Sequence, residues 1–396
     1  MNKLKKAFAL LISVLLLSTC FIGCGGLGGN GGSGEQVNNP TGAYEVKTGD
    51  EASGVDFIIN YPAGKDITIL QLADIQVLCY HTARNETRKN QLKNACFNRL
   101  SEHHQIRAWQ YVDEAVARVK PDLIVLTGDQ VYGETDDSGV LWQEMCERMD
   151  TYGVPWLNIF GNHDNESAKG VQWQVDELLK SKHCVFKQGE VTGNSNYNVL
   201  LTSGGKPVQM LYLFDSNGCR VIDNPGEGMN PDNVDKDKVF QGWGVQYDQV
   251  RWFKRSVQKS VKKYGELPIL SFMHIPPISN EQVTAIYPDA NTFPFKPDKE
   301  GDFGTSTEKI VGAYDADFWY ELIMAGCTDI YSGHQHQVAT SIVIDGIRVT
   351  YGLKTGTYAY HDEELCGSTK IVVSAKDKKA TTSYVPTNIP YAVNKI

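Results

Sequence analysis

Acidic, amide and imidazole side chains follow five short apolar runs of the sequence, each near the point where the run ends. Continuous apolar runs are typical of strands that are buried on both faces. Ligands of α/β sheets bind in the crevice at the carboxyl ends of such strands. The polar groups concerned are Asp74 and Gln76 after residues 67–72, Asp129 after 123–126, Asn162, His163 and Asp164 after 155–160, His274 after 267–273, and His334 and His336 after 329–332. We therefore expect these side chains to gather at one edge of the fold.

The chemistry of this set is that of a transition-metal site, because it combines imidazole nitrogens with carboxylate and amide oxygens. Carboxylates that converge on one crevice would repel each other unless a cation neutralised them. Two metal ions about 3.5–4 Å apart, bridged by one carboxylate, would act on both the attacking and the leaving oxygen of a displacement at phosphorus. The pattern therefore predicts a two-metal site suited to phosphoryl chemistry.

The order and separation of the motifs resemble those of the calcineurin-like metallophosphoesterases. The specific motifs are Gly-Asn-His-Asp at residues 161–164 and Gly-His-Gln-His at 333–336, each after an apolar run. The resemblance covers residues 67–336, and Phe-Met-His-Ile-Pro-Pro at 272–277 is similar to the branch related to purple acid phosphatases. It implies a four-layer α/β/β/α sandwich of two mixed sheets, with a dinuclear metal site at the strand ends.

The resemblance also implies a role for each motif residue. The implied metal ligands are Asp129 as the bridge, Asp74 and His336 in the first site, and Asn162, His274 and His334 in the second. His163 would be the general acid at the leaving group, oriented by Asp164. A metal-bridging hydroxide would be the nucleophile that attacks a phosphate ester, with a small phosphomonoester favoured as the substrate.

One position departs from the family pattern, because Gln76 stands where the first motif usually has His. Two interpretations follow. Purple acid phosphatases also lack this His and have Tyr three residues after the bridging Asp, as Tyr132 stands here. A Tyr132 phenolate would favour ferric iron in the first site, with zinc, manganese or iron in the second. Alternatively, Gln76 leaves the first site degenerate, and the protein is a lipid-anchored binding protein with little or no catalysis.

The composition of the 396-residue chain is that of an ordinary globular protein, with 41% apolar and 21% charged residues. Its formal net charge of −9 argues against nucleic acid as the main partner. The charge does not exclude a small anionic substrate, because a bound metal can dominate the local field.

The N-terminus has the features of a bacterial lipoprotein signal. Lys3, Lys5 and Lys6 precede an apolar segment at residues 7–17 that is too short to span a membrane. Phe-Ile-Gly-Cys at residues 21–24 resembles a lipoprotein box, which implies cleavage before Cys24 and a lipid on its thiol. A secreted protein with an ordinary signal peptide is the alternative. We therefore expect a signal peptide at residues 1–23, a lipidated and Gly-rich linker at 24–54, a catalytic domain at 55–396, and an extracytoplasmic, membrane-anchored location.

Within this domain, helical spacing of apolar residues predicts helices at 102–119, 142–152, 171–181, 247–264 and 315–325. Ile106 and Val261 are expected on the buried faces of the first and fourth of these helices. Residues 215–242 and 276–312 form two long insertions with no regular pattern. Residues 35–54 are polar, and they predict either a continuation of the linker or an edge of the sheet.

Overall fold

The computed structural model describes residues 37–38, 44–77, 101–132, 139–164, 169–218 and 242–390. The expected signal peptide, Cys24 and most of the expected linker lie outside these residues. In the described ranges, no helix has both the length and the apolar character that crossing a membrane requires.

The smaller sheet carries the first three motifs. Within the described residues it has five strands, in the order β15 (Ala380–Pro386), β14 (Gly367–Val373), β4 (Ile67–Leu72), β5 (Leu123–Thr127) and β6 (Trp156–Ile159). β4, β5 and β6 are parallel, and the antiparallel β14–β15 hairpin adds to β4. Helices α2 (Ser101–Val119) and α3 (Val140–Thr151) precede β5 and β6, and α4 (Val171–Lys180) follows them.

The larger sheet carries the last two motifs. Its ten described strands have the order β1 (Val37–Asn38), β2 (Glu45–Thr48), β3 (Phe57–Tyr61), β7 (Tyr197–Ser203), β8 (Lys206–Phe214), β9 (Ile269–Met273), β11 (Cys327–Ser332), β13 (Ile347–Tyr351), β12 (Val338–Ile344) and β10 (Phe303–Ser306). β8, β9, β11 and β13 are parallel neighbours at its centre, whereas β12 and β10 are antiparallel additions. Both sheets are therefore mixed.

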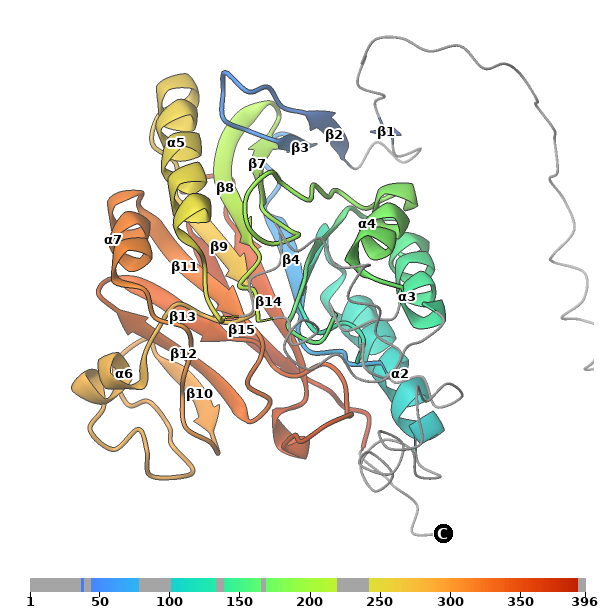
Figure 1. Ribbon diagram of the computed structural model, residues 1–396, viewed down its shortest axis with the longest axis vertical. Helices are drawn as coiled ribbons and strands as arrows, with labels where there is room; N and C mark the ends of the chain where they lie inside the picture. The colour runs from blue at the N-terminus through green and yellow to red at the C-terminus, as the bar shows by residue number, and fades with distance from the viewer. Residues whose placement is uncertain are drawn as a thin grey trace, which may run out of the picture. The chain divides into compact units, whose positions relative to one another are not determined.

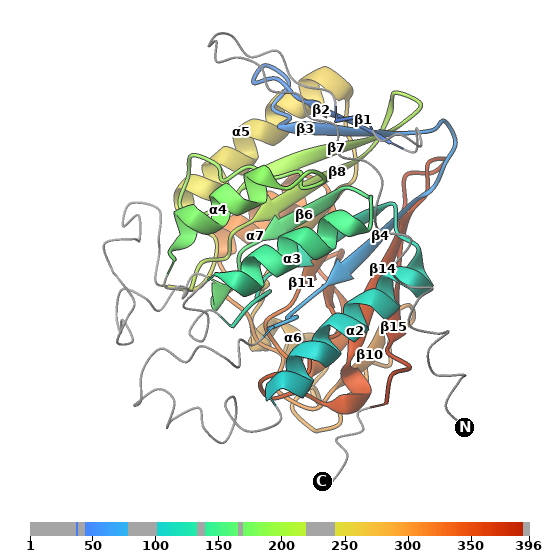
Figure 2. The same cartoon turned by 90° about the vertical axis from the view of Figure 1, so that its right-hand side faces the viewer.

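Helices cover the two sheets from opposite sides (Figure 1). In the turned view, α2, α3 and α4 lie side by side over the smaller sheet (Figure 2). α5 (Tyr247–Tyr264) and α7 (Ala316–Met324) cover the outer face of the larger sheet, and the short α6 (Asn280–Ile286) lies near β12. One apolar cluster joins α2–α4 to the inner faces of both sheets, and a second fills the space under α5–α7. The predicted α/β sandwich with two mixed sheets is confirmed.

Several details differ from the expectations. β2 pairs with β3 as part of the sheet edge, so the folded domain begins before residue 55 and the edge interpretation of this stretch holds. Ile106 and Val261, expected to be buried, are 48% and 38% exposed. The core is contacted instead by other residues of the same helices, such as Val112 of α2 and Phe253 of α5, which are fully buried. The second insertion contains α6 and β10. A one-turn 3-10 helix follows later in the chain, at Glu363–Leu365.

Candidate metal centre

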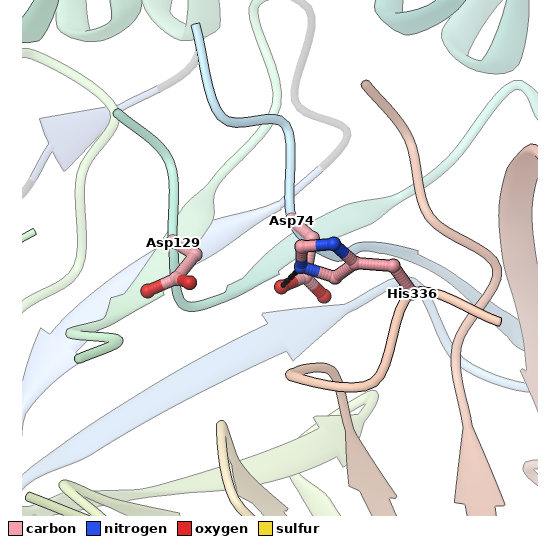
Figure 3. Close-up of side chains that lie close together, drawn as sticks. All are labelled: Asp74, Asp129 and His336. Atoms are coloured by element: carbon pink, nitrogen blue, oxygen red, sulfur yellow. Dashed lines mark ion pairs between the residues drawn. The ribbon is translucent and has the colours of Figure 1, made fainter. Parts of the chain in front are cut away.

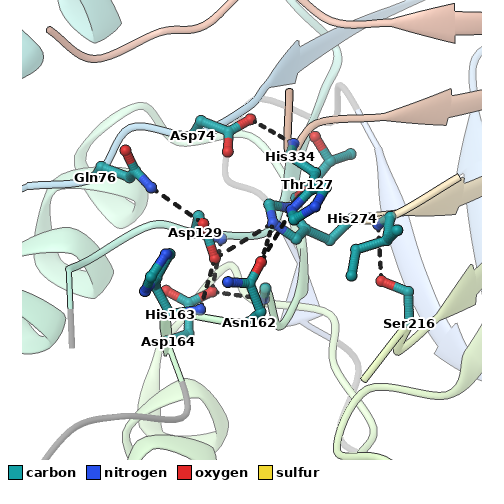
Figure 4. A network of polar contacts seen from close by, with 12 residues as sticks. Asp74, Gln76, Thr127, Asp129, Asn162, His163, Asp164, Ser216, His274 and His334 are labelled. Carbon is teal, nitrogen blue, oxygen red and sulfur yellow. Dashed lines mark hydrogen bonds and ion pairs between the residues drawn. The ribbon is translucent and has the colours of Figure 1, made fainter. Parts of the chain in front are cut away.

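The five predicted strand ends meet at one place because the strands that carry them run parallel and in register. Leu72 pairs with Leu126, and Thr127 pairs with Ile159, so β4, β5 and β6 end together. In the other sheet, Phe272 of β9 pairs with Tyr331 of β11. The residues that follow these ends extend into the same region, as the close-up shows (Figure 4).

The turns that follow the strands have an unusual backbone. Asp74, Gln76, Asp129 and His334 all have positive φ, at 52°, 45°, 53° and 75°. Left-handed backbone is unfavourable for residues with a Cβ atom, and such strain is found most often at functional sites. Two glycines permit close approaches here, because a Cβ at Gly161 would collide with the Asp129 carboxylate and one at Gly333 with the Asp74 carboxylate.

Asp74, Asp129 and His336 form the first group of candidate ligands. One ligand atom from each lies within 4.8 Å of the others, and all three side chains are buried (Figure 3). His336 donates its Nδ1–H to the Tyr360 carbonyl at 2.8 Å, which leaves Nε2 unprotonated and 3.3 Å from Asp74 Oδ1. Asp74 Oδ1 is buried and has no hydrogen-bond partner among the described residues. An unpartnered carboxylate oxygen beside a free imidazole nitrogen fits a bound cation.

Asn162, His274 and His334 form a second group that shares Asp129. Asn162 Oδ1 lies 3.0 Å from both His274 Nε2 and His334 Nδ1. His274 Nε2 is also 3.4 Å from Asp129 Oδ1. Because the His274 Nδ1–H donates to the Thr127 carbonyl at 2.9 Å, its Nε2 is the nitrogen available to a metal. The structure therefore brings these three side chains together beside Asp129, which lies between the two groups. Metal binding by the second group stays a prediction.

The charges of the site are strongly coupled. Burial opposes ionisation of Asp129, but the nearby His274 and His163 outweigh it and hold the pKa of Asp129 below its ordinary value. Burial also acts against a charged His274, yet Asp129 raises the pKa of His274 to about 9. Burial and His274 together lower the pKa of His334 to about 3. Without a metal, the site therefore holds a protonated His274 where a cation would otherwise balance the carboxylates.

Asp164 supports the loops of the site through its carboxylate. That group accepts hydrogen bonds from four backbone N–H groups, at 2.8 Å from Gly161, Asp129 and Gln130 and 3.1 Å from Val131. Burial and the charge of Asp129 act to raise the pKa of Asp164, whereas the backbone donors act to lower it. Because both oxygens accept two N–H groups each, the geometry requires the ionised carboxylate. Asp164 thus ties the turn after β5 to the turn after β6. Its predicted effect on the His163 ring stays a prediction.

Aromatic rings lie against three imidazoles of the site. Tyr132 stacks on His163 with ring centroids 4.5 Å apart, and Tyr360 stacks on His336 at 4.4 Å. Trp243, 47% exposed, meets His334 edge-on at 4.8 Å. Metal ligation by Tyr132 stays a prediction.

Sequence reasoning identified the candidate ligands that the structure brings together, but it missed residues that surround them. Trp243 and Tyr360 lie in or beside loops without a motif, so no pattern pointed to them. Lys354 follows the apolar strand β13 just as Asp74 follows β4, so the rule of polar groups at strand ends could have found it.

Comparison with known proteins identifies the family. The family model "Calcineurin-like phosphoesterase" matches residues 67–337, which is more than half of the chain. The chain belongs to the calcineurin-like phosphoesterase family. Members typically bind a dinuclear metal centre and are typically hydrolases, and Asp74, Asp129 and His336 are a candidate metal site for this chain.

Similar proteins include purple acid phosphatase relatives. "Probable inactive purple acid phosphatase 29" of Arabidopsis thaliana is 24% identical, over 81% of this chain and 80% of that protein. "Phosphatase DCR2" of Saccharomyces cerevisiae is 25% identical, over 52% of this chain and 34% of that protein. The solved structure of purple acid phosphatase PPD1 from yellow lupin covers 84% of this chain and 54% of that chain, with 12% identity and a TM-score of 0.40.

Proposed function

We propose that the protein hydrolyses phosphate esters, and small phosphomonoesters in particular, with two bound metal ions. The observation that carries the proposal is the position of Asp129 between two groups of ligand atoms. Asp74 and His336 would complete one site, and Asn162, His274 and His334 the other. The ions would supply positive charge to the phosphate oxygens and acidify a water molecule.

His163 would donate a proton to the leaving oxygen when the ester P–O bond breaks. Its backbone N–H donates to Asp129 Oδ1 at 2.9 Å. This hydrogen bond holds the His163 backbone beside the central carboxylate, so the imidazole starts from a position close to it. Tyr132 stacks on one face of the ring and restricts its orientation. General acid catalysis of this kind contributes roughly 10²–10⁴-fold to a rate.

The test combines metal analysis with hydrolysis of 4-nitrophenyl phosphate. We expect two metals per chain, a His163→Ala variant that keeps both metals and loses roughly 10²–10⁴-fold in kcat, and a His336→Ala variant that loses one metal. His183→Gln is the control, because His183 lies beside the opposite end of β6 from Asn162 and bonds to Tyr44. Equal activity of His163→Ala and the wild type would contradict the assignment.

A binding protein with a degenerate first site is the second candidate. Gln76 favours it, since its amide Nε2 donates to Asp129 Oδ2 at 3.1 Å and leaves three clustered groups in the first site. The name of the Arabidopsis thaliana relative, which describes that protein as probably inactive, points the same way. At most one metal per chain, with no hydrolysis by the wild type, would select this candidate.

We also propose that a lipid on Cys24 anchors the chain to the membrane, with the folded domain on the extracytoplasmic side. The three lysines, the short apolar segment and the Phe-Ile-Gly-Cys motif support this location. Metabolic labelling with a radioactive fatty acid should label the wild type and leave a Cys24→Ser variant unlabelled. Equal labelling of the two proteins would exclude this anchor.

A further inference from the structure

Lys354 is a buried cation beside the first group of ligands. It is 2% exposed and lies just after β13, where its backbone forms bridges with both Ala73 and Cys366. Thr355 N donates to the Ala73 carbonyl at 2.8 Å, and Gly367 N donates to the Lys354 carbonyl at 2.9 Å. These contacts fix the lysine between the turn that carries Asp74 and the start of β14.

The Lys354 ammonium group determines how the Gln76 amide is oriented. Nζ donates to Gln76 Oε1 at 2.8 Å and to the Asp74 carbonyl at 3.0 Å. The opposite end of the amide, Nε2, donates to Asp129 Oδ2 (Figure 4). The reversed amide would place its NH2 group against the ammonium and its oxygen against a carboxylate, so only one orientation is compatible with both neighbours.

This arrangement has two consequences for a cation held by Asp74, Asp129 and His336. The oxygen of Gln76 is the amide atom that can bind a metal, and it is engaged by Lys354 instead. The ammonium is also a positive charge in a buried region, where repulsion between cations is stronger than in water. Burial lowers the pKa of Lys354 to about 8, so the side chain is still mainly protonated at pH 7. Both effects weaken binding at the first site, and the repulsion acts more strongly on a trivalent ion than on a divalent one.

We propose that Lys354 is a positioning residue that holds the Gln76 oxygen away from the first metal site and makes this site the weaker of the two. The inference rests on the proposed pair of metal sites. It gives Gln76 a role as a hydrogen-bond donor to the shared carboxylate rather than as a ligand. It also predicts that the first site takes a divalent ion that exchanges with solvent.

The experiment is a titration of the metal-free protein with Mn²⁺ or Zn²⁺ in competition with a chromophoric chelator at pH 7. The step that a His336→Ala variant abolishes is assigned to the first site. We expect a Lys354→Met variant to bind about 10-fold more tightly in this step, because the repulsion between the ammonium and the metal is removed and the Gln76 oxygen is released. Lys370→Met is the matched control, since Lys370 lies on β14 and pairs with Leu70 of β4, away from the ligand turns.

An unchanged or weaker first step in Lys354→Met would overturn the inference, because a lysine that only ties the two segments together would weaken metal binding when removed. If Lys354→Met does not fold, Lys354→Gln and the wild type provide the test. In the wild type, the step that His336→Ala abolishes must be the weaker one, and the reverse order overturns the inference. A wild type that binds no metal would instead reject the proposed function.

Discussion

At the scale of single residues, Asp164 shows how one buried carboxylate can organise a site without touching the reaction. Its two oxygens accept four backbone N–H groups from the turns after β5 and β6. Hydrogen bonds to charged groups contribute about 1.5–3 kcal/mol each, and a buried donor left without a partner costs a similar amount. An Asp164→Asn variant replaces one accepting oxygen by a donor, so two of these N–H groups would face another N–H.

We expect Asp164→Asn to lower the free energy of unfolding by about 2–4 kcal/mol, measured by urea denaturation. Metal binding should weaken as well, because Asp164 fixes the backbone of Asp129. Asp176→Asn is the control, since Asp176 is exposed on α4 and accepts one bond from Gln172. A stability equal to that of the control would show that these four bonds do not hold the turns in place.

At the scale of elements, the sequence was sufficient to locate the strands that matter for function. Buried parallel strands are continuous apolar runs, and polar residues at their carboxyl ends must face one crevice once the strands are parallel and in register. The expected helix at 247–264 matches α5, since its apolar spacing is regular. β10 lies in an insertion without such spacing, and its pairing with β12 defines it. α6 is too short for a clear apolar period, but the Ser279–Gln282 capping box at its start is a local signal that sequence reasoning overlooked.

The orientation of Gln76 could not be predicted in the same way. Its amide is set by Lys354, which is 278 positions away in the sequence. The sequence alone therefore presented Gln76 as a weak ligand, whereas the fold presents it as a donor to Asp129. The contact between Trp243 and His334 also joins residues far apart in the sequence, and a backbone bridge between Trp243 and Asn217 holds the tryptophan near the end of β8.

At the scale of the whole molecule, the candidate metal site is a buried region in which the fold brings several charged side chains together. Asp74, Asp129, His274 and Lys354 are all buried, and the folded chain must stabilise them together. In the metal-free protein, Asp129 raises the pKa of His274 to about 9 despite burial, so this imidazole is protonated at neutral pH. A metal ion needs the neutral imidazole, and binding must therefore release a proton.

This linkage predicts that a metal stabilises the protein more at pH 8 than at pH 6. The His274 pKa in the folded, metal-free protein lies above the unfolded value, so the pairing with Asp129 stabilises that form fully below about pH 6.5, and the contribution is lost as pH rises through about 9. Release of one proton also strengthens metal binding about 10-fold per pH unit over this range, or about 2.7 kcal/mol from pH 6 to 8. The two changes arise from the same proton equilibrium and are not additive, so the stabilisation by metal grows by about 2.7 kcal/mol in total between pH 6 and pH 8. The measurement is the shift in Tm on adding a fixed excess of Mn²⁺ at each pH, with His274→Gln as the variant in which the pH dependence should be lost. A larger shift at pH 6 than at pH 8 would mean that His274 is not protonated in the metal-free fold, and that another cation balances Asp129.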